Sequence, residues 1–387
     1  MRTRILASFT VAALAALLLT GCERKKDMTG RPVEFSAGIS DNSAGTRSGL
    51  PGTRVVYGDI TGTGTTQSLN WEIGDKLTIY CAQCTKVQTD VESAKHVSDY
   101  VVTEVDPDET GSDSYAAIGN PGPDVEGLQW GDDVEHVFYA VYPKTSISGR
   151  TITGTIPQIQ SVKSVSETAS KVAAPYMTSM YMVSKTVVPA SKVGDDVTLV
   201  FQPLTTALEF TVTNKFDDNK KNMVVKSVTL VSDSHVLNGG FKVDMDDTNG
   251  GAGYHYGRPK TTLTLTGDIA DADKTVTMDF GDGIAVPYEG TLTFTFFLNP
   301  GNATEVDDLT FEISGTNKYN DSPFTRRARL EDKDGKGVKF PTHQKTRIGG
   351  VMVPESIIWT IDDINVSVAD FEVVKSSEMK EYFGITL

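Results

Sequence analysis

The chain has 387 residues, which is long for a single domain, so two domains are the first expectation. Its 36 lysines and arginines against 51 aspartates and glutamates give a net charge of −15. This excess of negative charge argues against nucleic-acid binding through a basic surface. With 39% hydrophobic and 22% charged residues, the chain can bury a sizeable core and does not resemble a disordered acidic protein.

The first 21 residues predict an export signal rather than a part of the fold. Arg2 and Arg4 precede an apolar run, 5–19, that is too short and wrongly flanked to span a membrane. The run ends in small residues before Cys22, as in a bacterial lipoprotein cleavage site. We therefore expect residues 1–21 to be a lipoprotein signal peptide, with Cys22 acylated and holding the mature chain to a membrane. An ordinary secretory signal with Cys22 as an incidental thiol is the alternative.

Residues 22–54 are rich in Gly, Ser, Thr and Arg, and we interpret them as a tether that contains one strand. The apolar residues of this strand recur at period two: Val33, Phe35, Ala37 and Ile39. A lone strand is not stable in water, so we expect this one to pair elsewhere in the fold.

Beyond the tether, apolar and polar residues alternate at period two in many short runs. The clearest are 77–81, 197–201, 208–212, 263–265, 276–280, 292–298, 309–313 and 364–368. One buried and one solvated face is typical of antiparallel sheets that pack in pairs. Clusters of Gly, Asn and Asp separate the runs as turns. Only 91–101 and 164–173 have a pattern that a helix could also adopt.

These patterns predict an all-β chain with two sandwich domains in tandem. The alternation is interrupted where Pro189, Ser191 and Gly194 follow one another. We place the domain boundary there, which gives an N-terminal domain, 55–190, and a C-terminal domain, 191–387.

Two of the three cysteines, Cys81 and Cys84, have the Cys-x-x-Cys spacing. A redox site of this kind needs a helix N-terminus that lowers the pKa of the first thiol, and no amphipathic helix follows here. We interpret the two residues as a structural pair that could close a disulfide outside the cytoplasm. A redox site and half of a zinc site are the alternatives.

No grouping of residues predicts catalysis or metal binding. The five histidines are scattered without metal-ligand spacing: His96, His136, His235, His255 and His343. The acidic segment 106–113 resembles a calcium loop, but Ala117 stands where a bidentate glutamate would close it. Neither a nucleophile elbow, a zinc-protease motif nor a phosphate-binding glycine loop is present. We therefore predict no catalytic residue, no metal site and no cofactor, and a protein that is not an enzyme.

A series of motifs runs through the chain in a characteristic order. They are Thr53-Arg54, 70–79 (NWEIGDKLTI), 138–143 (FYAVYP), 156–160 (IPQIQ), 197–201 (VTLVF), 339–341 (KFP) and 345–350 (KTRIGG). In this order they resemble the fimbrillin family of Bacteroidales, lipoproteins that include the subunits of type V pili. The chain has Pro203 where relatives often carry histidine, which leaves the subfamily open. We expect Trp71 to cover an apolar sheet face and Gly74-Asp75 to form the turn into the next strand.

The resemblance implies two transthyretin-like β-sandwich domains, export to the outer membrane as a lipoprotein, and polymerisation by strand exchange after a protease cuts behind an arginine. The strand at 33–39 would then be a removable plug in a groove of its own domain. Arg54 is our preferred cleavage point and Arg47 the second, for an arginine-specific or trypsin-like protease. The alternative is that both are ordinary solvated arginines.

The end of the chain repeats the period-two pattern with Phe383, Ile385 and Leu387. Residues 381–387 could therefore donate a strand to the vacated groove of a neighbouring pilus subunit, head to tail, or could complete a sheet of their own domain. We predict a structural subunit of cell-surface fimbriae with other pilus subunits as partners. The alternative is a monomeric surface lipoprotein that binds a glycan or host ligand through sandwich loops, where Trp130 stands in a loop-like stretch.

Overall fold

The computed structural model describes residues 28–39, 56–61, 66–86, 94–105, 115–122, 125–216, 220–246, 264–267, 270–299, 306–318, 321–331, 337–338, 344–352 and 357–368. The prediction of an all-β chain is confirmed. Both stretches that a helix could have adopted contain strands instead, β5 (Val97–Val105) in the first, and parts of β10 (Ile159–Val165) and β11 (Ser170–Pro175) in the second. Across the described ranges, no helix combines the length and the hydrophobicity that crossing a membrane would require.

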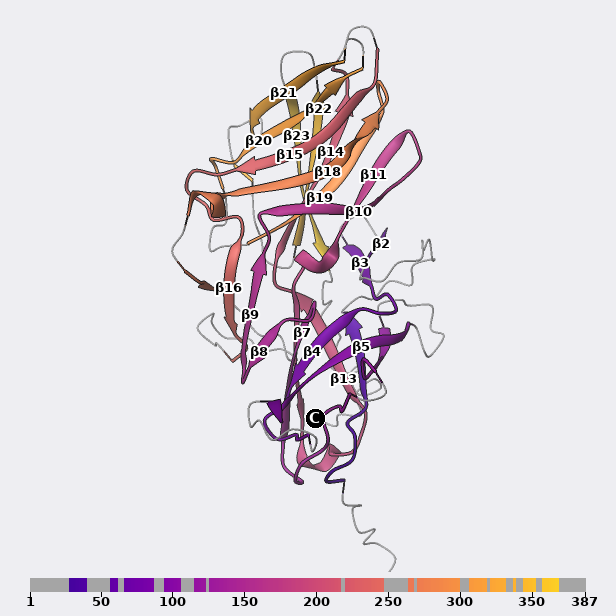
Figure 1. The fold of residues 1–387 in the computed structure, drawn as a ribbon, viewed down its shortest axis with the longest axis vertical. Helices are drawn as coiled ribbons and strands as arrows, with labels where there is room; N and C mark the ends of the chain where they lie inside the picture. The colour runs from indigo at the N-terminus through magenta and orange to yellow at the C-terminus, as the bar shows by residue number, and fades with distance from the viewer. Residues whose placement is uncertain are drawn as a thin grey trace, which may run out of the picture.

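Seven strands close a barrel, which forms the lower lobe in Figure 1. In order around the barrel they are β1 (Phe35–Ile39), β13 (Val197–Pro203), β12 (Met182–Val188), β7 (His136–Tyr142), β4 (Lys76–Tyr80), β5 and β6 (Tyr115–Gly119). Neighbouring strands pair antiparallel, except β1 and β13, which run parallel. The alternating apolar residues of these strands point inward and fill the barrel with one continuous core.

A twelve-stranded sheet forms the upper lobe and folds back on itself. Its order is β2 (Val56–Thr61), β3 (Thr66–Asn70), β23 (Ile357–Val368), β22 (Gln344–Met352), β14 (Thr206–Asn214), β19 (Thr291–Leu298), β11, β10, β18 (Thr275–Val286), β15 (Met223–Val231), β20 (Thr310–Asn317) and β21 (Ser322–Arg329). Apolar side chains of β14 and β19 share one core with those of β15, β18 and β20. The part of the sheet that contains β14 and β19 therefore packs face to face against the part that contains β15, β18 and β20. This is the arrangement of a sandwich, as the period-two pattern predicts.

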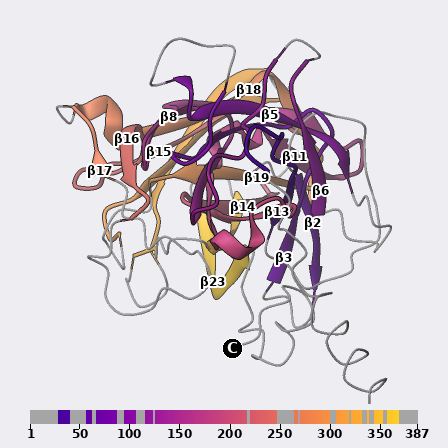
Figure 2. The same cartoon turned by 90° about the horizontal axis from the view of Figure 1, so that it is seen from below.

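A third, four-stranded sheet lies along the outside of the barrel. Its order is β17 (Thr264–Leu265), β16 (Gly239–Asp244), β9 (Thr151–Ile156) and β8 (Ser146–Ser148). The view from below in Figure 2 shows β16 and β17 to one side of the barrel strands. Residues of β9 and β16 pack with outward-facing residues of β7 and β12 in a separate small core.

Each of the three sheets contains strands from both sides of residue 190. β13 closes the barrel, β10 and β11 pair with β18 and β19, and β9 pairs with β16. Each lobe is therefore built from strands of both predicted segments, 55–190 and 191–387. The domain boundary between these segments stays a prediction.

Candidate functional site

The first described strand, β1, occupies a slot between β13 and β6. Phe35 to Ile39 pair in parallel register with Val197 to Phe201 on one side, and Phe35 to Gly38 pair antiparallel with β6 on the other. The Val197 N–H donates to the Glu34 carbonyl over 2.9 Å, and the hydroxyls of Ser36 and Thr198 lie 3.1 Å apart. The barrel is closed only because β1 bonds to both neighbours.

The apolar side of β1 is part of the barrel core. The alternation predicted for this strand is confirmed, since its four apolar residues are all buried in that core: Val33, Phe35, Ala37 and Ile39. Phe35 stands edge-on to Tyr100, with ring centroids 5.1 Å apart, and to Phe138 at 5.4 Å. Burying a side chain such as Phe35 or Ile39 is worth about 1.5 to 3 kcal/mol, so the slot is strongly apolar.

A small side chain, Ala37, lies at the centre of the slot. Ala37 lies opposite Ala116 of β6 and opposite Leu199 of β13. Both alanines have 0% of their surface exposed. Because both lie in a fully buried, packed core, a longer side chain at either position would have to displace its neighbours.

The residues that precede β1 are also seated by backbone hydrogen bonds, along a strip formed by residues 128–131. The Val33 N–H donates to the Leu128 carbonyl over 2.9 Å, and the Trp130 N–H donates to the Arg31 carbonyl over 2.9 Å. The Gly30 N–H donates in turn to the Trp130 carbonyl over 2.8 Å. The segment 28–39 is therefore paired along most of its length, which the local sequence did not indicate.

Trp71 and the Gly74-Asp75 turn have the structural role that we expected. Trp71 is buried and packs edge-on against Tyr142 and Phe201, at centroid distances of 5.4 and 5.3 Å. The buried Asp75 carboxylate accepts a hydrogen bond from the Glu72 N–H over 2.9 Å and one from the Tyr142 hydroxyl over 3.1 Å. Gly74 has a φ of 93°, a conformation that favours glycine. These contacts fix the backbone at the start of β4, one of the strands of the barrel.

Trp130 lies in the barrel core rather than on the surface. It is buried, and its ring stands edge-on to His136 and Phe138, with centroids 5.0 and 5.7 Å away. The idea that Trp130 offers a loop platform to a glycan is therefore wrong. His136 is buried beside it and donates from Nδ1–H to the Val134 carbonyl over 2.8 Å, and burial lowers the pKa of its imidazole.

Cys81 and Cys84 lie side by side in the same core as two thiols, both buried. Their pairing as a disulfide stays a prediction. Within the described residues, no group of three or more His, Cys, Asp and Glu side chains could hold a metal ion.

Several predicted site residues lie outside the described residues. They are the lipidation site Cys22, the cleavage sites Arg47 and Arg54, and the donor residues Phe383, Ile385 and Leu387. The acidic segment 106–113, His255 and His343 lie outside them as well. The roles assigned to these residues stay predictions.

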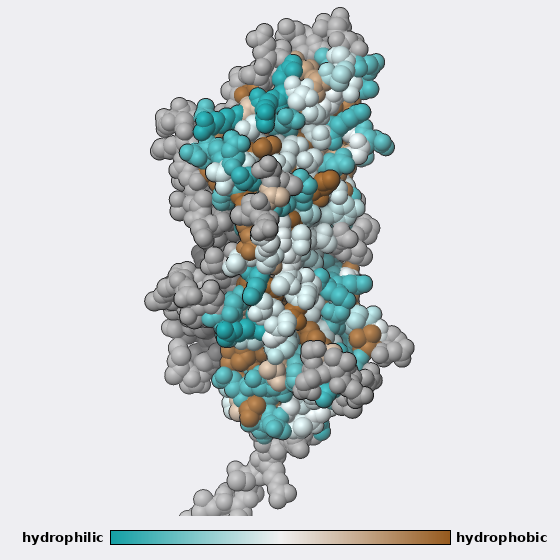
Figure 3. All heavy atoms as spheres, turned by 60° about the vertical axis from the view of Figure 1, so that its left-hand side comes forward, coloured by the Kyte–Doolittle hydropathy of each residue, from teal (hydrophilic) through white to brown (hydrophobic). Residues whose placement is uncertain are grey.

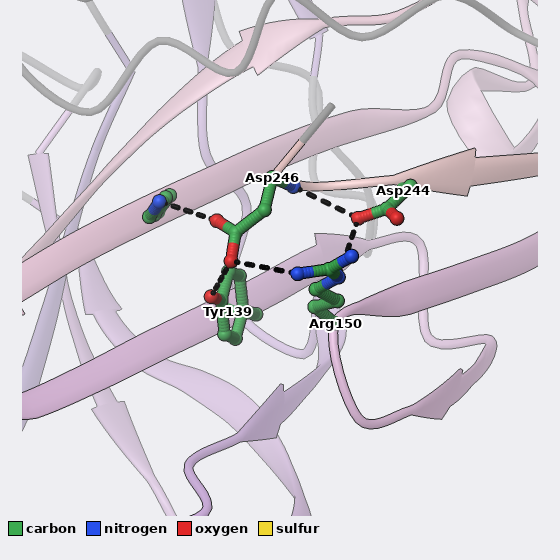
Figure 4. A network of polar contacts seen from close by, with 5 residues as sticks. Tyr139, Arg150, Asp244 and Asp246 are labelled. Carbon is green, nitrogen blue, oxygen red and sulfur yellow. Dashed lines mark hydrogen bonds and ion pairs between the residues drawn. The ribbon is translucent and has the colours of Figure 1, made fainter. Parts of the chain in front are cut away.

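A network of charged side chains fastens the end of β16 to the barrel (Figure 4). Asp246 accepts a hydrogen bond from the Tyr139 hydroxyl over 2.8 Å and forms an ion pair with Lys185 of β12. Arg150 bonds to Asp244 over 2.9 Å and lies 3.6 Å from Asp246. Burial alone would raise the pKa of Asp246, but the bonds from Lys185 and Tyr139 and the charge of Arg150 hold it below its usual value. The partners satisfy one another, which is the arrangement of a structural clamp.

Figure 3 shows the surface with the left-hand side of Figure 1 turned toward the viewer. On this face, hydrophobic residues are scattered in small groups among hydrophilic ones. Large apolar patches mark docking sites. The apolar side chains of β1 are instead buried inside the barrel, as part of its core.

Comparison with known proteins gives a family match over most of the chain. Residues 53–337 match the family model described as fimbrillin-like, a segment that begins after β1. No curated protein was found to match the chain. A candidate cell adhesion protein from Bacteroides ovatus is similar in structure at 14% identity and a TM-score of 0.48, over 88% of this chain and 99% of that one. A fimbrial assembly protein from Parabacteroides distasonis is similar at 10% identity and a TM-score of 0.32, over 86% of this chain and 95% of that one.

Proposed function

The chain belongs to the fimbrillin-like family, and from this premise we propose that it is a structural subunit of cell-surface fimbriae that polymerises by strand exchange once β1 has been removed. Family membership supports a fimbrial or adhesion role and a structural rather than an enzymatic protein. The proposal of strand exchange rests on the position of β1. This short strand lies near the beginning of the sequence, and it closes the barrel by pairing with β13 and β6.

Removal of β1 would turn a closed barrel into an open one. The backbone groups of β13 and β6 that now bond to β1 would lose their partners, and the pockets of Phe35, Ala37 and Ile39 would open to water. An unpaired strand edge beside an apolar floor is a template for another strand. The vacated slot is thus an acceptor site for a strand of matching pattern.

The proposed trigger is a cut behind Arg54 or Arg47 by an arginine-specific or trypsin-like protease. Both arginines lie in the sequence between β1 and β2, so a cut at either would separate the segment that contains β1 from the body of the protein. If Cys22 carries the lipid anchor in the outer membrane, the same cut releases the subunit from that anchor.

The proposed donor is the tail, residues 381–387, of another copy. Its period-two residues Phe383, Ile385 and Leu387 supply apolar side chains for the slot. Two or three such side chains, at about 1.5 to 3 kcal/mol each, together with backbone pairing, suffice for a durable contact. Because donor and acceptor are different surfaces, the contact is head-to-tail and repeats into a filament.

Limited trypsin digestion of the chain without residues 1–22 tests this proposal. We expect an early cut at Arg54 or Arg47, followed by a ladder of polymers on a gel. The double variant Arg47→Ala, Arg54→Ala should resist the early cut and stay monomeric. A chain that is cut at these sites but remains monomeric would contradict strand exchange and favour the monomeric binder of a glycan or host ligand.

A further inference from the structure

The turn that contains the two cysteines has the geometry of a cross-linkable pair. The Cys84 N–H donates to the Cys81 carbonyl over 3.2 Å and closes a four-residue turn directly after β4. The ends of such a turn lie within about 7 Å of each other, and the Cα atoms of a disulfide are about 4.4 to 6.8 Å apart. The two thiols share a hydrogen bond, and their residues are only 0% and 1% exposed. The separation expected across this turn is therefore compatible with a disulfide.

This turn also supports the strip on which the N-terminal segment is seated. Thr85, the next residue, exchanges two backbone hydrogen bonds with Gln129, at 3.1 and 2.9 Å. Gln129 pairs on its other side with Pro32. The strip 128–131 is therefore held between the cysteine turn and the segment that leads into β1.

Contacts of Gln83, in the middle of the turn, strengthen the connection. Its side-chain carbonyl accepts a hydrogen bond from the Val137 N–H over 3.1 Å. Its backbone carbonyl approaches Gly131 so closely that a Cβ there would lie 2.0 Å away. Any change in the shape of the turn must therefore pass to the strip.

We propose that Cys81 and Cys84 form a disulfide that cross-links this turn. The cross-link thereby stiffens the seat of β1, which is the strip 128–131 to which the segment leading into β1 is hydrogen-bonded. The inference goes beyond the proposed function, because it concerns how firmly the segment 28–39 is held, whether or not the subunit polymerises.

The oxidant is an external disulfide, carried by a protein or by a small thiol compound. One of the two cysteine thiolates attacks one sulfur of that disulfide, forms a mixed disulfide and releases the first external thiolate. The other cysteine then loses its proton and attacks the sulfur of the first cysteine, which releases the second external thiolate. Two cysteine thiols are oxidised by two electrons, and one external disulfide is reduced to two thiols.

In the folded barrel, the surroundings of the pair shift the pKa values of the two thiols in opposite directions. Burial alone would raise the pKa of Cys81, but hydrogen bonds from the Cys84 thiol and from the backbone of Gln83 lower it. Burial and the adjacent Cys81 raise the pKa of Cys84. Because the folded barrel covers both sulfurs, the exchange takes place while the turn is still open, and the finished disulfide is shielded from reductants.

The first test counts thiols in the full chain exported with its own leader and recovered from the cell envelope. The protein is denatured in an alkylating agent without reductant, and the peptide that contains residues 81–84 is weighed. We expect this peptide to be unlabelled and lighter by two hydrogens than the dithiol form, and to take two labels after reduction. Two labels without prior reduction would overturn the proposal.

The second test asks whether the cross-link stiffens the seat. Amide hydrogen exchange is compared between the oxidised chain and the same chain after reduction in mild denaturant and return to buffer. We expect the Val33 and Trp130 amides to exchange about tenfold faster after reduction, because the turn that supports them then opens locally more often. The Phe210 amide, in the other lobe, is the internal control and should not change.

The variant Cys81→Ala, Cys84→Ala should behave like the reduced chain and be insensitive to reductant. Equal exchange at the seat in both redox states would overturn the stiffening role. A chain with free thiols that still polymerises refutes this inference alone, whereas a chain with the disulfide that is cut and stays monomeric refutes the proposed function alone.

Discussion

Ala37 and Ala116 meet at the centre of the β1 slot, where both side chains are fully buried. Replacing Ala37 with leucine adds three carbons to a packed core, so we expect the free energy of unfolding to fall by about 1 to 3 kcal/mol. Urea unfolding of the uncut chain measures this loss. Ser36→Leu places the same side chain on the opposite face of β1 and should cost less.

An Ala37→Leu chain as stable as the wild type would show that the centre of the slot can expand. In that case size could not decide which strands the slot accepts. Partial recovery of stability on adding Ala116→Gly would locate the conflict at this pair.

His136 predicts a dependence of stability on pH. Burial lowers the pKa of its imidazole from the ordinary value of 6.5, although the Val134 carbonyl and the charges of Asp132 and Asp133 act in the opposite direction. The unfolded chain therefore binds the proton more tightly than the folded chain does. The stability that neutral His136 contributes is complete above pH 6.5 and is lost as the pH falls from there through the lower, folded pKa.

We expect the melting temperature of the wild type to fall more steeply below pH 6.5 than that of His136→Phe. His235, whose pKa burial also lowers, contributes equally to both proteins and cancels in the difference. Parallel curves for the two proteins would show that His136 has similar pKa values in the folded and unfolded states.

At this scale the sequence predicted which side chains of β1 are buried, because period-two alternation is a local property. It did not predict that Trp130 and His136 are core residues. Gly127 to Asp133 are mostly glycine and polar residues, which is typical of a loop, and the burial of Trp130 depends on Phe138 and on a segment a hundred residues earlier in the chain.

At the scale of the elements, β1 is unusual because its partner β13 runs parallel to it, whereas the other neighbouring strands of the barrel pair antiparallel. The existence of both strands could be predicted from their alternation. Their pairing could not, because residues 35 and 197 are brought together only by the complete barrel. The strands β10 and β11 illustrate a second limit, since a short run of mixed residues fits a helix or a strand until its partners are known.

The proposed donor strand gives an element-scale prediction. Deletion of residues 381–387 should leave the unfolding of the uncut monomer within about 0.5 kcal/mol of the wild type, as for changes away from the core. The same deletion should abolish the polymer ladder after trypsin cleavage. Gel filtration before and after cleavage distinguishes the two effects.

A matched control exchanges the three apolar tail residues for serine without changing the length of the chain. If the deleted chain still polymerises, the donor lies elsewhere. If it unfolds much more easily than the wild type, the tail completes a sheet of its own domain instead.

At the scale of the whole molecule, the lobes are joined through Phe297 of β19, a strand of the upper sheet whose Phe297 side chain packs in the barrel core, and through an ion pair. The buried side chain of Gln160 bonds to both backbone groups of Phe297, at 2.6 Å to the carbonyl and 3.0 Å from the N–H. Phe297 belongs to the barrel core, while its neighbour Phe296 on β19 belongs to the core of the sandwich. Lys163 adds an ion pair with Glu72 over 2.7 Å.

Gln160→Ala leaves the two buried backbone groups of Phe297 without these partners. We expect a loss of about 1 to 3 kcal/mol in the free energy of unfolding. We also expect less cooperative unfolding, because the contact holds in place Phe297, the residue of the upper sheet whose side chain packs in the barrel core. Calorimetry measures both effects, and the exposed Gln158→Ala is the matched control. A Gln160→Ala chain that melts like the control would show that water or relaxed geometry satisfies these groups.

The closed barrel also has a consequence for the protein before it is cut by a protease. A ring of strands presents no edge to which a neighbour could add, so uncut copies can be crowded together in the envelope without sticking through this lobe. Under the proposed strand exchange, β1 would itself cover the acceptor slot until the protease cut. A high protein concentration alone would then not start the growth of a filament. The rate of proteolysis would determine when assembly begins.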